Sequence, residues 1–233
     1  MISEEDWRSN FKDTNILILT GGIEPYQKIL KLQREINNWV NENERLGFIL
    51  VLEHNDVYTC GIHTEHLDNR IPDPVRVERG GSITYHGPGQ IVVYYILNMK
   101  HLRTNILGII SQAHRSEIDV IENLGVRGVE SRLGKETGIW VGNRKIGSTG
   151  FAIKINSTLH GTALNIQPNL QKFSAINPCG FDWSIMTSVQ NETGKTHNIP
   201  QVKNKIIQEI IKNFGIKNYQ KKSLSEQLSE TAP

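Results

Sequence analysis

Residues 79–97 read Arg-Gly-Gly-Ser-Ile-Thr-Tyr-His-Gly-Pro-Gly-Gln-Ile-Val-Val-Tyr-Tyr-Ile-Leu, and this stretch decides the fold class. Its glycines bracket a short predicted strand, and the β-branched and aromatic run Ile91–Leu97 predicts a second strand. Glycines let a backbone approach a ligand closely or adopt positive φ. Arg79 and His86 would then supply a charge and a hydrogen-bond donor to a binding site. The alternative is a hairpin with glycine turns and a solvated arginine, and this stretch alone leaves both open.

Predicted strands and helices are mixed along the rest of the chain. Apolar residues recur at helical spacing in 25–43, 104–124 and 200–214, and the second helix is expected to be capped by Thr104. Apolar runs predict strands at 15–20, 47–53, 57–60, 138–141, 145–155 and 158–166. This mixture predicts an α/β fold, a single domain on a mixed β-sheet with flanking helices. We expect the domain to span residues 1–220 and the polar tail 221–233 to be frayed.

Composition excludes several classes of protein. The 233 residues carry 26 basic and 24 acidic side chains, a net charge of +2, whereas a dedicated nucleic-acid binder shows a clear basic excess. No apolar run approaches the roughly 20 residues that cross a bilayer. The first six residues are acidic where a targeting signal is basic. We therefore expect a cytoplasmic protein that binds neither nucleic acid nor membrane, with Cys60 and Cys179 as free thiols.

A second glycine-rich segment surrounds Lys145. Residues 144–150 read Arg-Lys-Ile-Gly-Ser-Thr-Gly, and because the lysine precedes the glycines this is not the phosphate-binding Walker pattern. If Lys145 points into a pocket, its ammonium group can hold an anion or a thiolate. The alternative is an exposed lysine on a strand, which is the commoner situation.

A third segment, Asn177-Pro178-Cys179-Gly180, presents a thiol in a predicted tight turn. A free thiol has a pKa near 8.5, so only a small fraction is thiolate at neutral pH, and a nearby cation such as Lys145 would lower that pKa. The alternative is an inert buried cysteine. Cys60 lies in a predicted apolar strand, where we expect a packing role.

The histidines allow two other interpretations. Cys60 and His63, with His54 and His66 nearby, could be metal ligands, but structural zinc sites usually show paired close spacings that are absent here, so no metal is expected. His86 or His160 could instead form a Cys–His hydrolase pair with Cys179. Sequence spacing does not exclude that pair.

Taken together, the segments 79–90, 144–150, 160–165 and 177–180 resemble the lipoyl(octanoyl) transferases. That family carries Arg-Gly-Gly-x-x-Thr-Tyr/Trp-His-Gly-Pro-Gly-Gln, a Gly-x-Lys-Ile-like strand, His-Gly-x-Ala-Leu-Asn and Asn-Pro-Cys-Gly. The four motifs occur here in the same order, from about Tyr26 to Phe214. The resemblance implies a fold similar to the catalytic domains of biotin and lipoate protein ligases, with residues 1–220 as an octanoyltransferase catalytic domain.

The resemblance also implies a reaction and its partners. Octanoyl, or lipoyl, would pass from acyl carrier protein to a lysine of the lipoyl domains of 2-oxo-acid dehydrogenases or of the glycine cleavage H protein, with no cofactor. Cys179 would be the acyl-thioester nucleophile and Lys145 the residue that activates it. The substrate-contacting residues would be Arg79, Gly80, Gly81, Ser82, Ile83, Thr84, Tyr85, His86, Ser148, Thr149, Gly150, His160, Gly161, Thr162 and Ala163.

Two departures and two rivals qualify the resemblance. Gly147 stands where relatives often carry Cys, Ala or Ser, and Thr149 where Leu or Ile is common, and either could alter the acyl tunnel. An ATP-dependent lipoate or biotin ligase would share the fold but would not need a cysteine nucleophile. A non-catalytic binder of acyl carrier or lipoyl domains would form no covalent intermediate.

Overall fold

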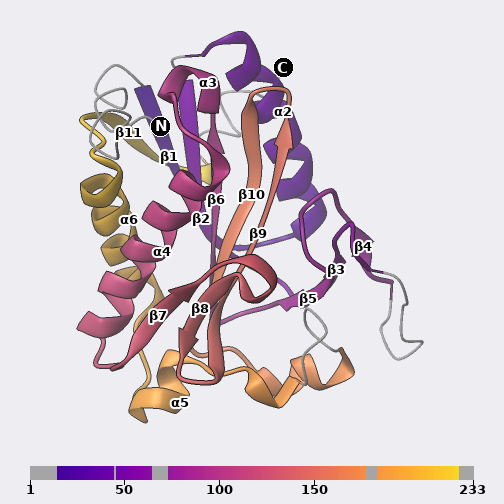
Figure 1. Cartoon of the computed structure of the whole chain (residues 1–233), viewed down its shortest axis with the longest axis vertical. Coiled ribbons are helices and arrows are strands. Elements are labelled where there is room, and N and C mark those ends of the chain that lie inside the picture. The colour runs from indigo at the N-terminus through magenta and orange to yellow at the C-terminus, as the bar shows by residue number, and fades with distance from the viewer. Residues whose placement is uncertain (1–14, 45, 65–72, 177–182, 226–233) are drawn as a thin grey trace.

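An eight-stranded mixed sheet forms the centre of the molecule (Figure 1). The computed structural model describes residues 15–44, 46–64, 73–176 and 183–225. Within them the strand order is β11-β1-β2-β6-β10-β9-β8-β7. The strands are β1 Asn15–Glu24, β2 Leu46–His54, β6 Gln90–Leu97, β7 Val129–Arg132, β8 Gly138–Val141, β9 Arg144–Lys154, β10 Ser157–Asn165 and β11 Asn218–Ser223. The β11-β1-β2 pairs are parallel and the remaining pairs antiparallel.

A small three-stranded sheet lies beside the large one, in the order β4-β3-β5. Its strands are β3 Val57–Cys60, β4 Val75–Arg76 and β5 Ile83–His86. The short predicted strand between the glycines is therefore β5, and it pairs with β3 in an antiparallel register. The glycine-rich stretch that leads into β5 therefore lies against the large sheet.

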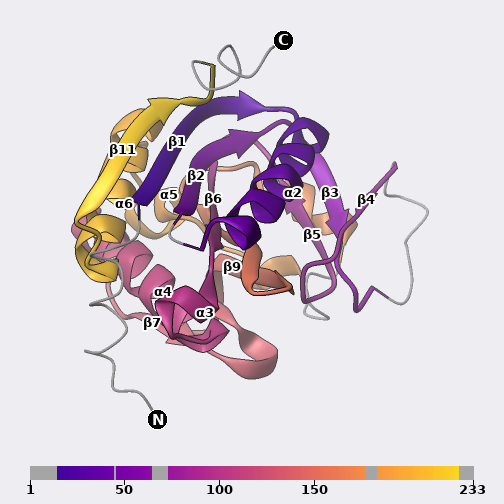
Figure 2. The ribbon, with the colours of Figure 1, turned by 90° about the horizontal axis from the view of Figure 1, so that it is seen from above.

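Helices cover both faces of the large sheet (Figures 1 and 2). Helix α2, Tyr26–Glu42, packs against β6 and β10 on one face. Helices α4, Ile106–Asn123, and α6, Ile199–Phe214, pack against each other on the other face. All eight residues of β6 are buried, because a central strand between two helical layers has no solvent-facing side.

Short helical turns connect these elements in the part of the chain that the structure describes. These are α3 Met99–Leu102, α5 Val189–Thr193, and the 3₁₀ turns η2 Gly134–Glu136, η3 Leu170–Ala175 and η5 Trp183–Ile185. Among the described residues, no helix combines the length and the apolar character that crossing a membrane requires.

The structure confirms the predicted mixed α/β architecture and corrects several details. Helix α4 is capped by Asn105, whose side chain accepts a hydrogen bond from the N–H of Gly108, and not by Thr104. Trp39, an apolar residue within the predicted helix 25–43, is 51% exposed and stacks on Phe48 of β2. The tail expected to fray from residue 221 instead continues β11 through Ser223, and Leu224 is buried. Residues 226–233 of that tail lie outside the described residues.

Candidate active site

Three of the four motif segments surround one narrow cavity between the glycine-rich loop before β5 and the strands β6, β9 and β10. Its volume is about 40 Å³. Twelve of the fifteen predicted substrate residues line it together with Tyr26, Val92 and Tyr94: Arg79, Gly80, Gly81, Thr84, His86, Ser148, Thr149, Gly150, His160, Gly161, Thr162 and Ala163. The sequence motifs thus come together in space.

The other three predicted residues point elsewhere. Ile83 and Tyr85 pack into an apolar cluster with Cys60 and Phe173. Ser82 lines a neighbouring trough of about 850 Å³, which shares Gly80, Gly81, Thr149 and Gly150 with the cavity. Alternation along β5 explains why Ile83 and Tyr85 face away from the cavity that Thr84 and His86 line, because successive side chains of a strand face opposite sides.

Glycine is required where strands and loop approach most closely. A Cβ atom at Gly161 would lie 2.0 Å from the carbonyl oxygen of Val93, on the adjacent strand β6. A Cβ at Gly150 would lie 3.0 Å from Cδ of Arg79 and 3.1 Å from the oxygen of Gly80. The absence of these side chains brings the loop against β9 and leaves the cavity between them.

Arg79 is a buried member of the cavity wall, 8% exposed, and not the solvated arginine of the alternative interpretation. One Nη atom donates to the carbonyl and the hydroxyl of Thr59, at 2.7 and 2.8 Å. The other donates to the carbonyl oxygens of Ser82 and Gly80, at 2.8 and 3.1 Å. The guanidinium group therefore fixes the shape of the glycine loop.

Three neutral histidines lie at or beside the cavity. Burial lowers the pKa of His54 to about 4 and that of His86 to about 3. His54 donates from Nδ1 to the carbonyl oxygen of Glu24 and accepts at Nε2 from the hydroxyl of Tyr94, 2.7 Å away. Burial also lowers the pKa of His160, while Glu78, 3.7 Å from its Nε2, acts in the opposite direction. At neutral pH these rings are poor acceptors for a proton.

Lys145 is buried, at 3% exposure, on the same strand as the cavity residues Ser148 and Thr149. Its Nζ donates to the carbonyl oxygen of Thr137 at 3.0 Å and lies 5.3 Å from the centroid of the Trp140 ring. Thr137 also lines the trough that joins the cavity. The alternative of an exposed strand lysine is therefore wrong, and the ammonium group is buried behind Thr137, a residue of the trough wall.

On the α4 side of the same strands, two buried side chains bond to cavity residues. His114 Nε2 pairs with the hydroxyl of Thr149 at 2.7 Å, and its Nδ1 pairs with the hydroxyl of Ser131 at 2.6 Å. One turn further along α4, Glu117 accepts a hydrogen bond from Thr162. The unusual Thr149 thus has a specific partner. Sequence analysis missed both helix residues, because helical spacing gives no sign of polar groups aimed into a core.

The two cysteines differ in what the structure shows of them. Cys60 is a free, buried thiol whose pKa is raised by burial, which confirms its packing role. Cys179 lies outside the described residues. Among the residues that are described, no cluster of three or more His, Cys, Asp or Glu side chains could hold a metal ion.

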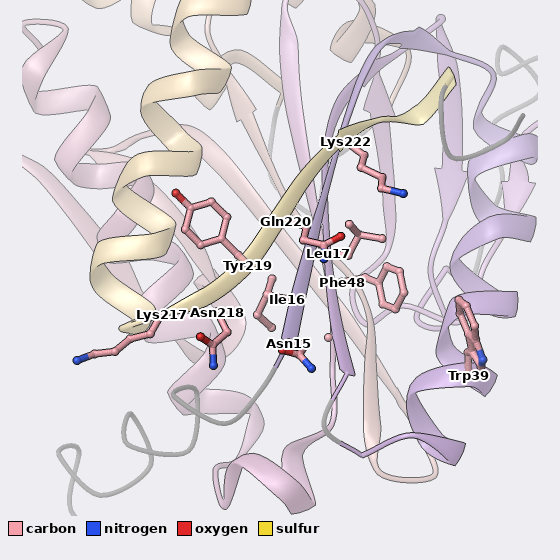
Figure 3. A pocket seen from close by; sticks show the side chains of 11 residues that line it. Asn15, Ile16, Leu17, Trp39, Phe48, Lys217, Asn218, Tyr219, Gln220 and Lys222 are labelled. Atoms are coloured by element: carbon pink, nitrogen blue, oxygen red, sulfur yellow. The ribbon is translucent and has the colours of Figure 1, made fainter. Parts of the chain in front are cut away.

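A larger hollow lies at the opposite edge of the sheet and contains none of the predicted site residues (Figure 3). This groove, of about 660 Å³, is bounded by β11, β1, β2 and the exposed ring of Trp39. Leu17 and Phe48 form its floor, and Lys217 and Lys222 lie at its rim. We call it the β11 groove.

Comparisons with known proteins agree on one family. The lipoyl protein ligase A/B catalytic domain family matches residues 25–211. A protein of Picrophilus torridus named "Probable octanoyltransferase 2" is 41% identical over 192 residues, which are 82% of this chain and 76% of that protein. An octanoyltransferase of a Thermoanaerobacter species is 34% identical over 209 residues, 85% of this chain and 90% of the relative.

Solved structures confirm the predicted fold. Lipoate-protein ligase A bound with ATP superimposes with a TM-score of 0.70 at 16% identity, over 94% of this chain and 92% of the ligase. Biotin protein ligase from Aquifex aeolicus, in complex with biotin and ATP, superimposes with a TM-score of 0.50 at 14% identity, over 86% of this chain and 70% of the ligase. At these identities the likeness concerns the fold alone.

Proposed function

Because this chain belongs to the lipoyl protein ligase A/B catalytic domain family, we propose that it is an octanoyltransferase that uses Cys179 and Lys145 in protein lipoylation. It takes an octanoyl or lipoyl group from acyl carrier protein as a thioester on Cys179. It then passes that group to a lysine of a lipoyl domain, such as those of 2-oxo-acid dehydrogenases or of the H protein.

One observation carries the proposal: three of the motif segments meet around a single cavity beside the buried ammonium group of Lys145. The names of relatives at 34% and 41% identity supply the reaction class. The fourth motif, Asn177–Gly180, is followed by residues that return to Lys145, because the N–H of Thr187 donates to the carbonyl oxygen of Lys145. The chain eight residues after Cys179 is therefore anchored on the Lys145 strand.

In the first step the Cys179 thiolate attacks the acyl carbonyl carbon and the new C–S bond forms. The C–S bond to the carrier breaks, and the carrier thiolate takes up the proton that Cys179 gave up. Exchange between two thioesters is nearly balanced in energy, so loading is reversible. Lys145 favours the thiolate over the thiol, because a cation near a thiol lowers its pKa.

In the second step the acceptor lysine amine attacks the Cys179 thioester. The C–N bond forms, the C–S bond breaks, and the amine loses a proton that Lys145 relays to the leaving thiolate. The amide product is more stable than the thioester, which drives this step forward. His86 is a poor candidate for the relay, since its pKa of about 3 leaves it without proton affinity at neutral pH.

The acyl chain would occupy the cavity between β9, β10 and the glycine loop. A volume of about 40 Å³ has room for only a few water molecules, each of which needs about 10–15 Å³. An eight-carbon chain is larger than that, so its entry requires the loop and strands to move apart. We therefore expect bound octanoyl to order and stabilise the residues that line the cavity.

The decisive experiment is the mass of the intact protein after incubation with octanoyl-acyl carrier protein, without ATP. We expect a gain of one octanoyl group, its loss in Cys179→Ala, its retention in Cys60→Ala, and its disappearance when a lipoyl domain is added. An absolute ATP requirement would indicate a ligase, and a protein that never gains mass would indicate a non-catalytic binder. Release of free octanoate without an acceptor would indicate a hydrolase.

The proposed location is the cytoplasm. It rests on a chain with only two cysteines, one of which, Cys60, is a free buried thiol.

A further inference from the structure

A chain of buried hydrogen bonds runs from the cavity wall to the backbone of Lys145. His86 Nδ1 pairs with Gln90 Oε1 at 2.7 Å, and Gln90 Nε2 donates to Asn165 Oδ1 at 3.0 Å. Asn165 Nδ2 donates to the carbonyl oxygen of Thr187 at 3.0 Å. The N–H of Thr187 then donates to the carbonyl oxygen of Lys145, also at 3.0 Å.

The direction of these bonds is fixed by the partners of Gln90. Its Nε2 also donates to the carbonyl oxygen of Tyr85 at 3.3 Å, so its Oε1 must face His86 and accept. Gln90 and Asn165 are each 1% exposed, and Thr187 is 2% exposed. Buried side-chain amides in one defined orientation hold their partners rigidly, because an alternative position leaves polar groups unpaired.

At Lys145 the sheet supports β9 on one side only, where Lys145 pairs with Trp140 of β8. The pairing of β9 with β10 ends at Gly147, two residues before Lys145 is reached. The pairing of β9 with β8 is shifted by an irregularity between Ile139 and Trp140. On the side that β10 has left, Lys145 pairs instead with Met186 and Thr187. On this side the position of the Lys145 backbone therefore depends on how Thr187 is held.

Thr187 is held from two directions. Asn165 binds its carbonyl oxygen, and its hydroxyl donates to Glu192 Oε1 at 2.6 Å. Glu192 in turn accepts two hydrogen bonds from Arg144, the residue before Lys145, at 2.8 and 2.7 Å.

Neither Gln90 nor Asn165 lines the cavity, so contact with the acyl chain does not explain the place of these two amides in the motifs.

We propose that Asn165, oriented by Gln90, is a positioning residue that fixes Lys145 for octanoyl transfer through Thr187. The proposal rests on the proposed function, since it assigns Asn165 a role in the step that Lys145 assists. Without the Asn165 bond, Thr187 and the Lys145 backbone shift together, and the ammonium group no longer meets the reacting sulfur in the productive geometry.

The test compares Asn165→Asp with Asn37→Asp in the full-length protein. Asn37 is also a fully buried asparagine that bonds to β10, donating to Ser157 and Thr158 at the other end of that strand. The two changes are chemically identical, but Asn37 lies on helix α2 and has no link to Thr187, whereas Asn165 on β10 bonds to it. Asn165→Ser serves as a second variant if Asn165→Asp does not fold.

For Asn165→Asp we expect kcat for octanoyl transfer to fall about 100-fold, with KM for octanoyl-acyl carrier protein changed less than about threefold. Hydrogen exchange at the Thr187 amide should accelerate in the same variant. Asn37→Asp should keep kcat within about twofold of wild type and leave the Thr187 amide protected. Wild-type kcat in folded Asn165→Asp, or an equal loss of kcat in Asn37→Asp, overturns the proposal.

Failure of the proposed function is visible separately. A wild-type protein that transfers no octanoyl refutes the transferase itself, and the positioning role is then decided by exchange at the Thr187 amide alone. Faster exchange in Asn165→Asp, and not in Asn37→Asp, supports the arrangement. Unchanged exchange in both variants overturns it.

Discussion

The cavity at β9 and β10 and the β11 groove show that chemistry, more than size, marks the site. The groove is far larger, about 660 Å³ against about 40 Å³. Tyr219 and Lys222 of the groove lie on the edge strand β11, where charged residues commonly prevent pairing with other chains, and Trp39 lies on helix α2. The cavity instead combines glycines and neutral histidines, and the strand β9 that forms part of its wall also carries the buried Lys145. Substitutions in the two places should therefore have very different consequences.

The largest difference is expected between two lysines. Lys145→Ala should slow octanoyl transfer by about 1,000-fold, because it removes the group that stabilises the thiolate and relays protons. Lys222→Ala, at the rim of the β11 groove, should leave the rate within about twofold of wild type. Steady-state rates with octanoyl-acyl carrier protein and a lipoyl domain measure both. Equal rates in the two variants would contradict the assignment of the reaction to the cavity rather than to the β11 groove.

A steric change should come next in size. Gly161→Ala places a Cβ atom 2.0 Å from the carbonyl oxygen of Val93, so β10 and β6 must separate. We expect a loss of about 3 kcal/mol in the free energy of unfolding, measured in urea, and slower transfer. Gly22→Ala is the matched control, since a Cβ there meets no atom within 4 Å. A fully stable Gly161→Ala protein would show that the close contact is not needed.

The buried carboxyl of Glu117, which bonds to the cavity residue Thr162, should make the stability of the protein depend on pH. Burial raises the pKa of Glu117 from 4.5 to about 8, so the folded protein prefers the protonated carboxyl. The ionised form opposes folding, and stability should therefore fall as pH rises from about 4.5 to about 8, by up to about 5 kcal/mol. Glu117→Gln should remove most of this dependence.

Urea unfolding at pH 6 and pH 9 checks that expectation. Glu122→Gln, an exposed residue on the same helix, should retain the wild-type dependence on pH. If Glu117→Gln and wild type lose the same stability between the two pH values, the carboxyl of Glu117 is not the titrating group.

The smallest effect is expected in the groove itself. Trp39→Ser removes a ring that is 51% exposed and that stacks on Phe48 at a centroid distance of 6.1 Å. We expect a loss of about 1 kcal/mol in stability and transfer within about twofold of wild type. A large loss of transfer would mean that the β11 groove takes part in the reaction.

Much of the site could be predicted from sequence because its residues lie in short continuous motifs. The glycine loop after Arg79 and the segment beginning at His160 each contribute several neighbouring residues to the cavity wall. Glycines and histidines among apolar strand residues are easily recognised, since plain packing does not require them. The mixed sheet followed from alternating strand and helix patterns.

The remaining features depend on contacts between distant parts of the chain. Tyr26 and Tyr94 line the cavity from a helix and a strand whose patterns indicate only a core. Strand β11 is polar because it is an edge strand, so its sequence did not distinguish it from a frayed tail. The link from Asn165 through Thr187 to Lys145 joins three separate segments, and no local pattern records it.

The central claim is that Lys145 activates the thiol of Cys179. The rate of Cys179 alkylation as a function of pH, read by peptide mass so that Cys60 is followed separately, tests it most directly. We predict a midpoint well below about 8.5 in the wild-type protein and a return to about 8.5 in Lys145→Ala. The same midpoint in both proteins would contradict the account.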